Sequence, residues 1–397
     1  MTISKNIESI MSRSSWIREM FEAGALLKAK YGQENVFDFS LGNPNIKPPD
    51  KFRQTLKDIV ESDGGLDHGY MPNTGYPHVR KSVADYLSGS LCMEGKAFLT
   101  ENEIIMTCGA AGALNVILKT ILNPGEEIIT PSPYFVEYNF YADNHGGVLK
   151  TVPTKPDFTL DIESIAAAIN EKTRGILINS PNNPTGQVYS EKSLAELGLL
   201  LEEMSKKLNR TIYLISDEPY RKIVYDNIEV PSILNCYKES IIANSYSKEL
   251  SIPGERIGYI AVNPEASYKK ELLGGMALAN RILGFVNAPA LMQRVVSALQ
   301  GASVDVAAYD RKRTLLCDGL AECGYEFEKP LGAFYLFSKT PIADDVEFVR
   351  ALQKEMILTV PGTGFGGPGY MRIAFCVDDK TIIKAMPGFK KVIEQYN

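Results

Sequence analysis

The stretch NSYSKELSIPGERIGYI, from Asn244 to Ile260, places one lysine among groups that bind anions. It begins at the end of an apolar run that is typical of a short buried strand. Lys248 follows Ser245 and Ser247 closely, and Arg256 comes eight residues after it. A solvated surface lysine needs no such neighbours, whereas a lysine that forms a covalent bond beside an anion does.

Outward from this stretch, apolar runs of strand length alternate with helical patterns from about residue 100 onward. Residues 108–122 repeat apolar side chains at helical spacing, and so do residues 191–208. This alternation predicts an α/β fold whose mostly parallel sheet is covered by helices on both faces. The ligand of such a fold binds beyond the carboxyl ends of the strands. The predicted strands are EIIMT (103–107), IIT (128–130), GILINS (175–180), TIYLIS (211–216) and SIIANS (240–245).

The chain has 397 residues, which is long enough for two domains. From about Pro289 the pattern changes to a helical stretch, then the strands GAFYLF and MRIAF, then a last helix. We therefore expect a large domain at residues 49–288 and a smaller α+β domain formed by residues 1–48 and 289–397.

The composition excludes several classes of partner. The formal net charge is −6 without any basic run, which argues against nucleic acid. The apolar stretches are too short to span a membrane, and the N-terminus shows no secretion signal. The six cysteines form no CxxC pair and the three histidines no HExxH motif, so we predict reduced cysteines and no metal site. These features predict a cytoplasmic protein.

An acid, a phenol and the lysine follow the ends of two predicted strands. Asp217 and Tyr220 lie in LISDEPY, and Lys248 follows the next strand. Asp217 alone could simply cap the next element. All three together are typical of a site for pyridoxal 5'-phosphate, whose aldehyde forms a Schiff base with a lysine and whose ring nitrogen pairs with an acid.

The phosphate of such a cofactor needs its own binding groups. CGAAG, at residues 108–112, offers unhindered backbone N–H groups at the start of a helix. Ser245 and Ser247 add hydroxyls, and Arg256 adds a planar cation. We infer that these groups hold the phosphate while Lys248 holds the aldehyde carbon.

The lysine segment resembles the attachment signature of the class I/II pyridoxal-phosphate aminotransferases, matching at Ser245, Lys248, Gly254, Arg256 and Gly258. Each short match is weak alone, but their shared order along nearly the whole chain is specific. The resemblance implies the fold type I architecture of aspartate aminotransferase-like enzymes. The other similar segments are LGNPN (41–45), YMPNTGYPHVR (70–80), CGAAGAL (108–114), PSPYFVEY (131–138), NNPTG (182–186), SDEPY (216–220) and MRIAF (371–375).

The resemblance also implies roles around the cofactor ring. Tyr134 would stack on the ring, and Asn183 and Tyr220 would hydrogen-bond its phenolic oxygen. Asp217 would pair with the ring nitrogen. Lys248 would be the Schiff-base partner and then the general base at the substrate's Cα.

At the phosphate, the resemblance implies backbone amides from Gly109, Ala110 and Ala111, joined by Ser245 and Arg256. The two alanines depart from the family pattern, because they leave this turn without a side-chain hydroxyl or amide. Phosphate binding there would rest on backbone groups.

For the substrate, the resemblance implies that Arg372 clamps the α-carboxylate of the amino acid, a contact that suits arginine geometry. Gly42 and Asn183 would lie near the same group. Tyr70 would reach the phosphate bound by a partner subunit, so the resemblance implies a homodimer.

These observations predict an aminotransferase that moves an amino group from an L-amino acid to a 2-oxo acid by a ping-pong mechanism through the Lys248 Schiff base. The alternative is a C–S β-lyase, or a related lyase or synthase, on the same fold. A ligand-binding or regulatory protein without enzymatic activity is less favoured, because both Lys248 and Asp217 are present.

The sequence leaves the donor open among aspartate, aromatic and alanine-like amino acids, and it does not identify the acceptor or the pathway. Arg281 and Lys119 are candidate cations for a side-chain carboxylate, although each could equally be a solvated helix residue.

VPGTGFGGPG, at residues 360–369, contains a literal GxGxxG. A dinucleotide site would require a helix next, whereas Pro368-Gly369 and a predicted strand follow. We therefore reject an NAD site and expect a flexible loop that leads to Arg372.

Overall fold

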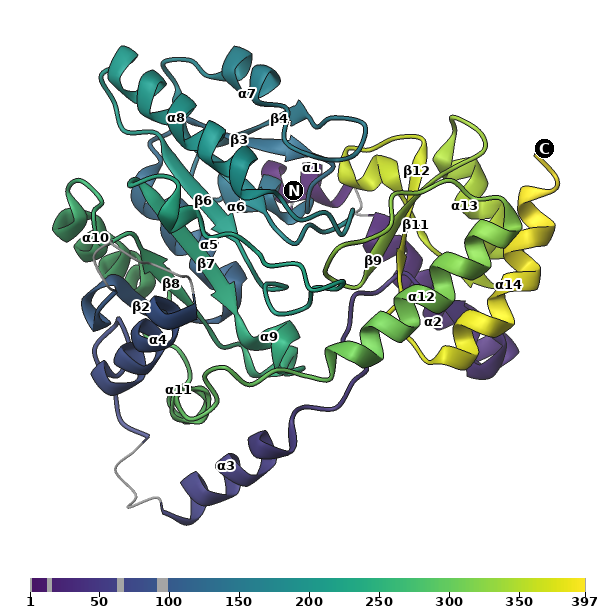
Figure 1. Cartoon of the computed structure of the whole chain (residues 1–397), viewed down its shortest axis with the longest axis horizontal. Helices are drawn as coiled ribbons and strands as arrows, with labels where there is room; N and C mark the ends of the chain where they lie inside the picture. The colour runs from purple at the N-terminus through teal and green to yellow at the C-terminus, as the bar shows by residue number, and fades with distance from the viewer. Residues whose placement is uncertain (1, 13–15, 63–67, 91–98, 397) are drawn as a thin grey trace.

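The computed structural model describes residues 2–12, 16–62, 68–90 and 99–396. Its centre is a seven-stranded sheet in the order β2-β8-β7-β6-β5-β3-β4 (Figure 1). β8 is antiparallel to both of its neighbours, and all other pairs are parallel, which confirms the predicted α/β class. The strands are β2 (Ile104–Thr107), β3 (Glu127–Ser132), β4 (Val148–Pro153), β5 (Thr173–Asn179), β6 (Tyr213–Asp217), β7 (Ser240–Ser245) and β8 (Gly258–Val262).

Apolar side chains cover both faces of this sheet, because successive residues of a strand point to opposite sides. On β5, Ile176 and Ile178 belong to one buried cluster and Leu177 to another. Helices α4, α7, α8 and α11 contribute to the first cluster, and α5, α6 and α10 to the second. These helices are α4 (Pro77–Ser90), α5 (Gly109–Ile121), α6 (Glu137–Asp143), α7 (Ile162–Ala168), α8 (Glu191–Lys207), α10 (Lys269–Ile282) and α11 (Ala290–Ser297).

A second, antiparallel sheet has the order β11-β12-β9 and lies beside the large one with the C-terminal helices (Figure 1). Its apolar cluster includes Met20 and Phe39 from the N-terminal part, and the rings of Phe39 and Phe389 lie 5.9 Å apart. The domain boundaries stay a prediction. The elements of this part are α2 (Trp16–Tyr31), β1 (Phe37–Asp38), α12 (Val306–Cys323), β9 (Tyr335–Lys339), α13 (Asp345–Lys354), β10 (Ile357–Leu358), β11 (Val360–Pro361), β12 (Tyr370–Ala374) and α14 (Asp379–Ile393).

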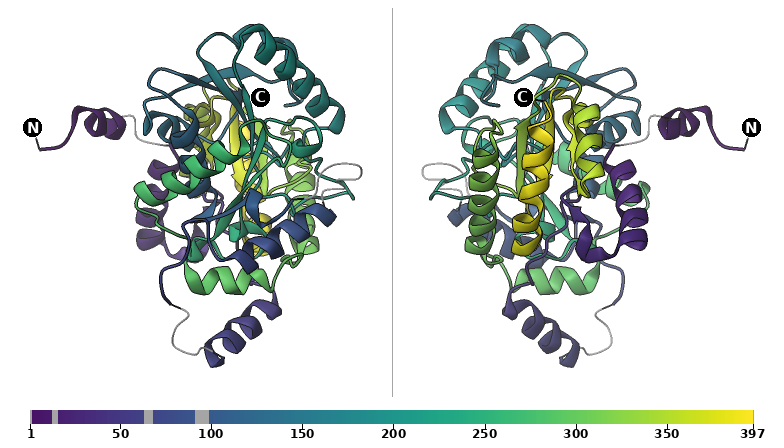
Figure 2. Two further views of the ribbon diagram at one scale, coloured as in Figure 1. Left: turned by 90° about the vertical axis from the view of Figure 1, so that its left-hand side faces the viewer. Right: turned by 90° about the vertical axis from the view of Figure 1, so that its right-hand side faces the viewer.

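Several shorter or peripheral elements complete the described chain. In Figure 2 the N-terminal helix α1 extends away from the body of the protein. The α-helices are α1 (Lys5–Ser12), α3 (Asp50–Glu61) and α9 (Tyr246–Glu249), and 3₁₀ helices span Gln33–Asn35, Glu101–Glu103, Ile233–Asn235, Pro253–Glu255 and Gly362–Phe365.

Side-chain caps begin helices where the sequence supplies a hydroxyl or a carboxylate. Ser190 Oγ accepts the backbone N–H of Ser193 (3.2 Å) at the start of α8. Asp305 Oδ1 accepts that of Ala308 (3.2 Å) at the start of α12. These caps set where helices on both sheets begin.

The register of the parallel strands brings three polar residues to one edge of the large sheet. Asn179, the last residue of β5, lies opposite Asp217, the last residue of β6. Asp217 in turn lies opposite Ala243 of β7, which ends two residues later at Ser245. Lys248 follows at once in α9. The strand ends therefore gather the predicted site residues.

The GxGxxG segment is followed by β12, as predicted, and not by a helix. The expectation of a flexible loop was wrong for its first part. Gly362 and Phe365 are buried in a 3₁₀ helix, and Gly367 N–H donates to Gly362 O (2.9 Å). The segment is a packed turn that delivers Arg372 on β12.

Two features bear on the excluded partners. Among the described residues, none of the helices combines the length and the apolar character needed to cross a membrane. The same residues contain no group of three or more His, Cys, Asp or Glu side chains placed to hold a metal ion.

A Gly258→Ala substitution tests how tightly β7, β8 and the turn before α5 pack. A Cβ atom at Gly258 would lie 2.3 Å from Asn244 O and 2.9 Å from Gly109 Cα. Because backbone would have to shift, we expect the free energy of unfolding, measured by denaturant titration, to fall by about 1–3 kcal/mol.

Gly274→Ala is the matched control on α10, where an added methyl group meets no atom within 4 Å. Alanine also favours a helix over glycine, so this variant should be unchanged or more stable by up to about 1 kcal/mol. Equal losses in the two variants would contradict the packing described here.

Candidate active site

A cavity of about 350 Å³ opens beyond the carboxyl ends of β5, β6 and β7. It brings together most of the residues that the sequence predicts for the site, from strand ends, loops and both sheets. The predicted residues that line it are Gly42, Ala110, Ala111, Asn183, Asp217, Tyr220, Ser245, Lys248, Arg256 and Arg372.

Lys248 lies in α9, directly after β7, and its side chain reaches the cavity. Its Nζ donates a hydrogen bond to the backbone oxygen of Gly42 (2.8 Å). Burial lowers the pKa of Lys248 to about 8, and the nearby Arg372 and Arg256 act in the same direction. A sizeable fraction of this amine is therefore neutral, and nucleophilic, at mildly alkaline pH.

Asp217 ends β6 and is fully enclosed. Its Oδ2 accepts a hydrogen bond from Tyr138 Oη (2.7 Å), and its backbone oxygen accepts one from Asn179 Nδ2 (2.7 Å). Its Oδ1 is buried and has no hydrogen-bond partner among the residues that the structure describes. Burial raises the pKa of Asp217 to about 7, while the bond from Tyr138 opposes this rise.

An acceptor left alone in the interior costs free energy unless a ligand satisfies it. Asp217 lines the cavity, so a donor bound there can reach the carboxylate. A ring N–H fits this requirement, and the residues present therefore suit the predicted ring.

Asn179 links the strand ends to the side of the cavity where Arg372 lies. Its Oδ1 accepts the backbone N–H of Asn183 (2.7 Å), which fixes the NNPTG turn. Asn183 Oδ1 then accepts from Arg372 Nη1 (3.1 Å). The amide groups thus connect β5 of the large sheet to β12 of the small one.

The guanidinium of Arg372 is buried and is held by a backbone oxygen and two aromatic rings. Its Nη2 donates to Ser40 O (2.6 Å), and its guanidinium lies 4.7 Å from the ring centre of Tyr335 and 4.6 Å from that of Phe365. Its Nε is buried, and no described residue hydrogen-bonds to it. A buried cation with an unused donor is well placed to bind a carboxylate.

Tyr220 and Tyr335 meet inside the cavity, with their hydroxyl oxygens 2.9 Å apart. Burial raises the pKa of both phenols, so each hydroxyl keeps its proton at neutral pH.

At the end of the cavity predicted for the phosphate, the guanidinium of Arg256 packs closely against the backbone at the start of α5. Gly109 begins α5 with φ +72°, and a Cβ atom there would lie 2.9 Å from Arg256 Nη2. Arg256 itself is left-handed, with φ +51°, and donates from Nη1 to Pro253 O (2.8 Å). Ser245 Oγ accepts the backbone N–H of Ser247 (3.3 Å). The start of α5, these hydroxyls and the guanidinium form a site suited to an anion.

Tyr134 requires a correction, because it does not line the cavity. Its backbone N–H donates to Phe365 O (3.0 Å), and its hydroxyl accepts from Asn139 Nδ2 (2.8 Å). These contacts hold it beside the turn at Gly366. Phe135 lines the cavity instead, so it is the better candidate for contact with a bound ring.

Tyr70 also lies outside the cavity of its own chain, and its side chain is 94% exposed. Its predicted contact with a partner subunit stays a prediction. Gly109 is not part of the cavity wall but packs directly behind Arg256.

Sequence reasoning missed the partners that orient the site: Tyr138, Asn179 and Tyr335. Tyr138 and Asn179 stand in or next to segments already recognised, four residues after Tyr134 and four before Asn183. Their polar side chains on otherwise apolar elements were the available signal. For Tyr335 the sequence offered no comparable signal, because an aromatic residue is common in a predicted strand.

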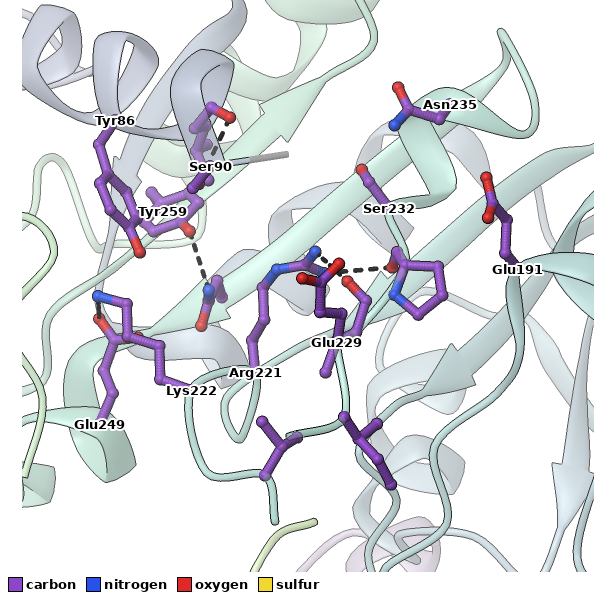
Figure 3. A pocket seen from close by; sticks show the side chains of 16 residues that line it. Tyr86, Ser90, Glu191, Arg221, Lys222, Glu229, Ser232, Asn235, Glu249 and Tyr259 are labelled. Atoms are coloured by element: carbon purple, nitrogen blue, oxygen red, sulfur yellow. Dashed lines mark hydrogen bonds and ion pairs between the residues drawn. The ribbon is translucent and has the colours of Figure 1, made fainter. Parts of the chain in front are cut away.

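A second cavity, of about 530 Å³, is lined by residues that include Glu249, Arg221 and Lys222 (Figure 3). Glu249 lines it, whereas Lys248 lines the first cavity. Its two cations are already paired: Lys222 Nζ lies 3.3 Å from Glu249 Oε1, and Arg221 Nη1 lies 2.9 Å from Glu218 Oε2. None of the predicted site residues lines it, so the first cavity is the candidate active site.

Comparison with known proteins points to one family. The family described as aminotransferase class I and II matches residues 34–387. The probable aspartate aminotransferase of Methanocaldococcus jannaschii is 29% identical over 390 residues, covering 96% of this chain and 98% of the relative. The aromatic-amino-acid aminotransferase 2 of Thermococcus litoralis is 30% identical, with 100% and 99% covered.

Solved structures agree with this. An amino transferase from Eubacterium rectale superposes with a TM-score of 0.96 at 40% identity, and both chains are fully covered. The aspartate aminotransferase of Thermus thermophilus with maleate gives a TM-score of 0.87 at 26% identity, covering 99% of this chain and 100% of the other.

An Asp217→Asn substitution tests the buried charge, because it removes the charge and keeps an acceptor for Tyr138. The folded pKa of about 7 lies above the unfolded value of about 3.9. Between these pH values the folded protein keeps a proton that the unfolded chain has lost, so its stability falls as pH rises.

The stability of the Asp217→Asn variant should not show this fall with rising pH, because asparagine does not titrate. We expect its free energy of unfolding, relative to wild type, to gain about 1.4 kcal/mol per pH unit from about pH 5 to 7 and then to level off. Urea titrations of both proteins without added ligand, at several pH values, measure this difference. A difference that is constant with pH would contradict the buried carboxylate.

Proposed function

Because this chain belongs to the class I and II aminotransferases, we propose that it transfers amino groups with pyridoxal 5'-phosphate bound in the cavity beyond β5, β6 and β7. The observation that carries the cofactor assignment is the buried, unpartnered Oδ1 of Asp217, in a cavity that also holds Lys248. The proposed substrates are an L-amino acid and a 2-oxo acid.

When bound, this cofactor supplies an aldehyde that condenses with amines and a ring that accepts the electron pair of a broken Cα–H bond. Asp217 would bind the ring nitrogen through its free oxygen. Asn183 and Tyr220 would bind the phenolic oxygen, and Phe135 would contact the ring. The start of α5, Ser245 and Arg256 would hold the phosphate.

Lys248 is suited to two tasks. Its depressed pKa, about 8, supplies the neutral amine that bonds to the aldehyde carbon. Once the substrate's amine has displaced it, Lys248 Nζ can take the proton from the substrate's Cα and would then deliver it to the cofactor carbon that carried the aldehyde. The nearby Gly42 O, which accepts from Nζ, helps to keep this amine in the cavity.

Arg372 orients the substrate. Its guanidinium would bind the α-carboxylate, while Asn183 and the two flanking rings prevent it from turning away. Fixing the carboxylate at one end aims the Cα–H bond toward Lys248. The oxo acid of the second half-reaction would bind through the same carboxylate contact.

The comparisons favour amino-group transfer over the alternative lyase. The matching family is one of aminotransferases, and the relatives described above are named for transfer from aspartate or aromatic amino acids. Lys248 and Asp217 also argue against a protein that only binds a ligand.

The candidate cations for a side-chain carboxylate do not line the cavity. Lys119 is exposed on α5 and Arg281 is exposed on α10. Neither can contact a substrate side chain within the cavity of its own chain. The names of the relatives include both acidic and aromatic donors, so the proposal is an L-amino acid without a narrower class.

We further propose a homodimer located in the cytoplasm. The dimer rests on the family resemblance at Tyr70, whose side chain is 94% exposed and is therefore accessible to a partner subunit. The location rests on the sequence alone.

A single half-reaction tests transfer against elimination. The purified protein, loaded with pyridoxal 5'-phosphate, is mixed with one amino acid at a time and no oxo acid. We expect one molecule of 2-oxo acid per active site, together with conversion of the cofactor to its amine form. Pyruvate and ammonia accumulating over many turnovers would support the lyase instead.

Arg372→Lys tests the carboxylate contact, because lysine keeps the charge but loses the planar pair of donors. Losing one hydrogen bond to a charged group costs about 1.5–3 kcal/mol, so we expect KM for the amino acid to rise roughly ten- to hundredfold. Arg53→Lys, on the peripheral α3, is the control and should leave KM unchanged. An unchanged KM in Arg372→Lys would mean that another group binds the carboxylate.

A further inference from the structure

Two buried tyrosines join the two sheets at the active site. Tyr220 follows β6 and Tyr335 begins β9, and their side chains are almost fully enclosed. Their hydroxyl oxygens lie 2.9 Å apart. Among the described residues, Tyr335 Oη has no other hydrogen-bond partner.

The surroundings fix Tyr335 in place. Its ring lies 4.7 Å from the guanidinium of Arg372 and packs edge-on against Tyr220, with 5.7 Å between ring centres. A Cβ atom at Gly42 would lie only 1.8 Å from Tyr335 Oη. Glycine at position 42 therefore leaves the space that this hydroxyl occupies.

One proton on each hydroxyl limits how the pair can be arranged. In the proposed function, Tyr220 donates its proton to the phenolic oxygen of the cofactor. The oxygen of Tyr220 can then only accept from Tyr335. The hydrogen bond must therefore run from Tyr335 to Tyr220.

We propose that Tyr335 is a positioning residue, which donates a hydrogen bond to Tyr220 and thereby strengthens the bond from Tyr220 to the phenolic oxygen of the cofactor. This inference rests on the proposed function. A hydroxyl that accepts one hydrogen bond donates the next more strongly, by about 10–30%.

The consequence is spectroscopic. When pyridoxal 5'-phosphate is attached to a lysine, its visible absorbance changes as the nitrogen that joins the two loses its proton. A hydrogen bond to the phenolic oxygen stabilises the deprotonated form and lowers the pKa of this change. Weakening the bond from Tyr220 must therefore raise that pKa.

The test is a pH titration of the visible absorbance of the cofactor-loaded protein. We expect Tyr220→Phe to raise the apparent pKa and Tyr335→Phe to raise it by about a tenth to a third of that shift. The double variant should match Tyr220→Phe alone, because Tyr335 acts only through Tyr220. Tyr370→Phe, on the same small sheet but outside the cavity, should titrate like wild type.

A second variant covers the case that Tyr335→Phe does not fold. Gly42→Ala displaces the hydroxyl while keeping the phenol, and it should raise the pKa in the same direction. An unchanged pKa in Tyr335→Phe or in Gly42→Ala, alongside a raised one in Tyr220→Phe, would overturn the proposal and leave the proposed function intact. Additive shifts in the double variant would also overturn it. A wild-type protein without any titrating visible band would overturn both.

Discussion

Asp217 carries a buried carboxylate of which, within the described part of the chain, only Oδ2 is hydrogen-bonded. Such a group destabilises the free protein at neutral pH, because burial opposes its charge. The fold keeps it in place through the register of β5 and β6 and through the hydroxyl of Tyr138. A hydrogen-bond donor bound in the cavity would offset the free energy lost by burying this carboxylate. In the proposed function, the ring nitrogen of the cofactor would be that donor. In the proposed function, the free protein would thus lose some stability and recover it when the cofactor binds.

In the proposed function, the large sheet would provide the cofactor's side of the cavity, and the small sheet would provide the substrate's side. Lys248 and Asp217 come from neighbouring strand ends, so their separation follows from the sheet itself. Arg372 comes from β12, and its position depends on Asn183 and on the two rings that flank it. The contact between Tyr220 and Tyr335 also connects the two sheets, beside the place proposed for the cofactor. The proposed chemistry at the Cα atom would thus require both sheets to be correctly packed.

Much of this was predictable from the sequence. The alternation of strands and helices predicted the α/β class, and the residues at the strand ends lie together because parallel strands end at one edge. Sequence patterns did not predict which of two neighbouring side chains points into the cavity. Tyr134 and Phe135 are neighbours, and only the packing of the turn beside Gly366 shows that Phe135 faces the cavity. The partners of Asp217 and Tyr220 were missed because their contacts join distant segments, such as Tyr138 with Asp217. The packed turn at Gly362 was mistaken for a flexible loop because its glycines also suit one.

The central claim is that Lys248 is the residue that bonds to the cofactor. Borohydride reduction of the protein loaded with pyridoxal 5'-phosphate, followed by proteolysis and mass spectrometry, tests it most directly. The account predicts that the peptide containing Lys248 carries the reduced cofactor. A label on another lysine, or no label on any peptide, would contradict it.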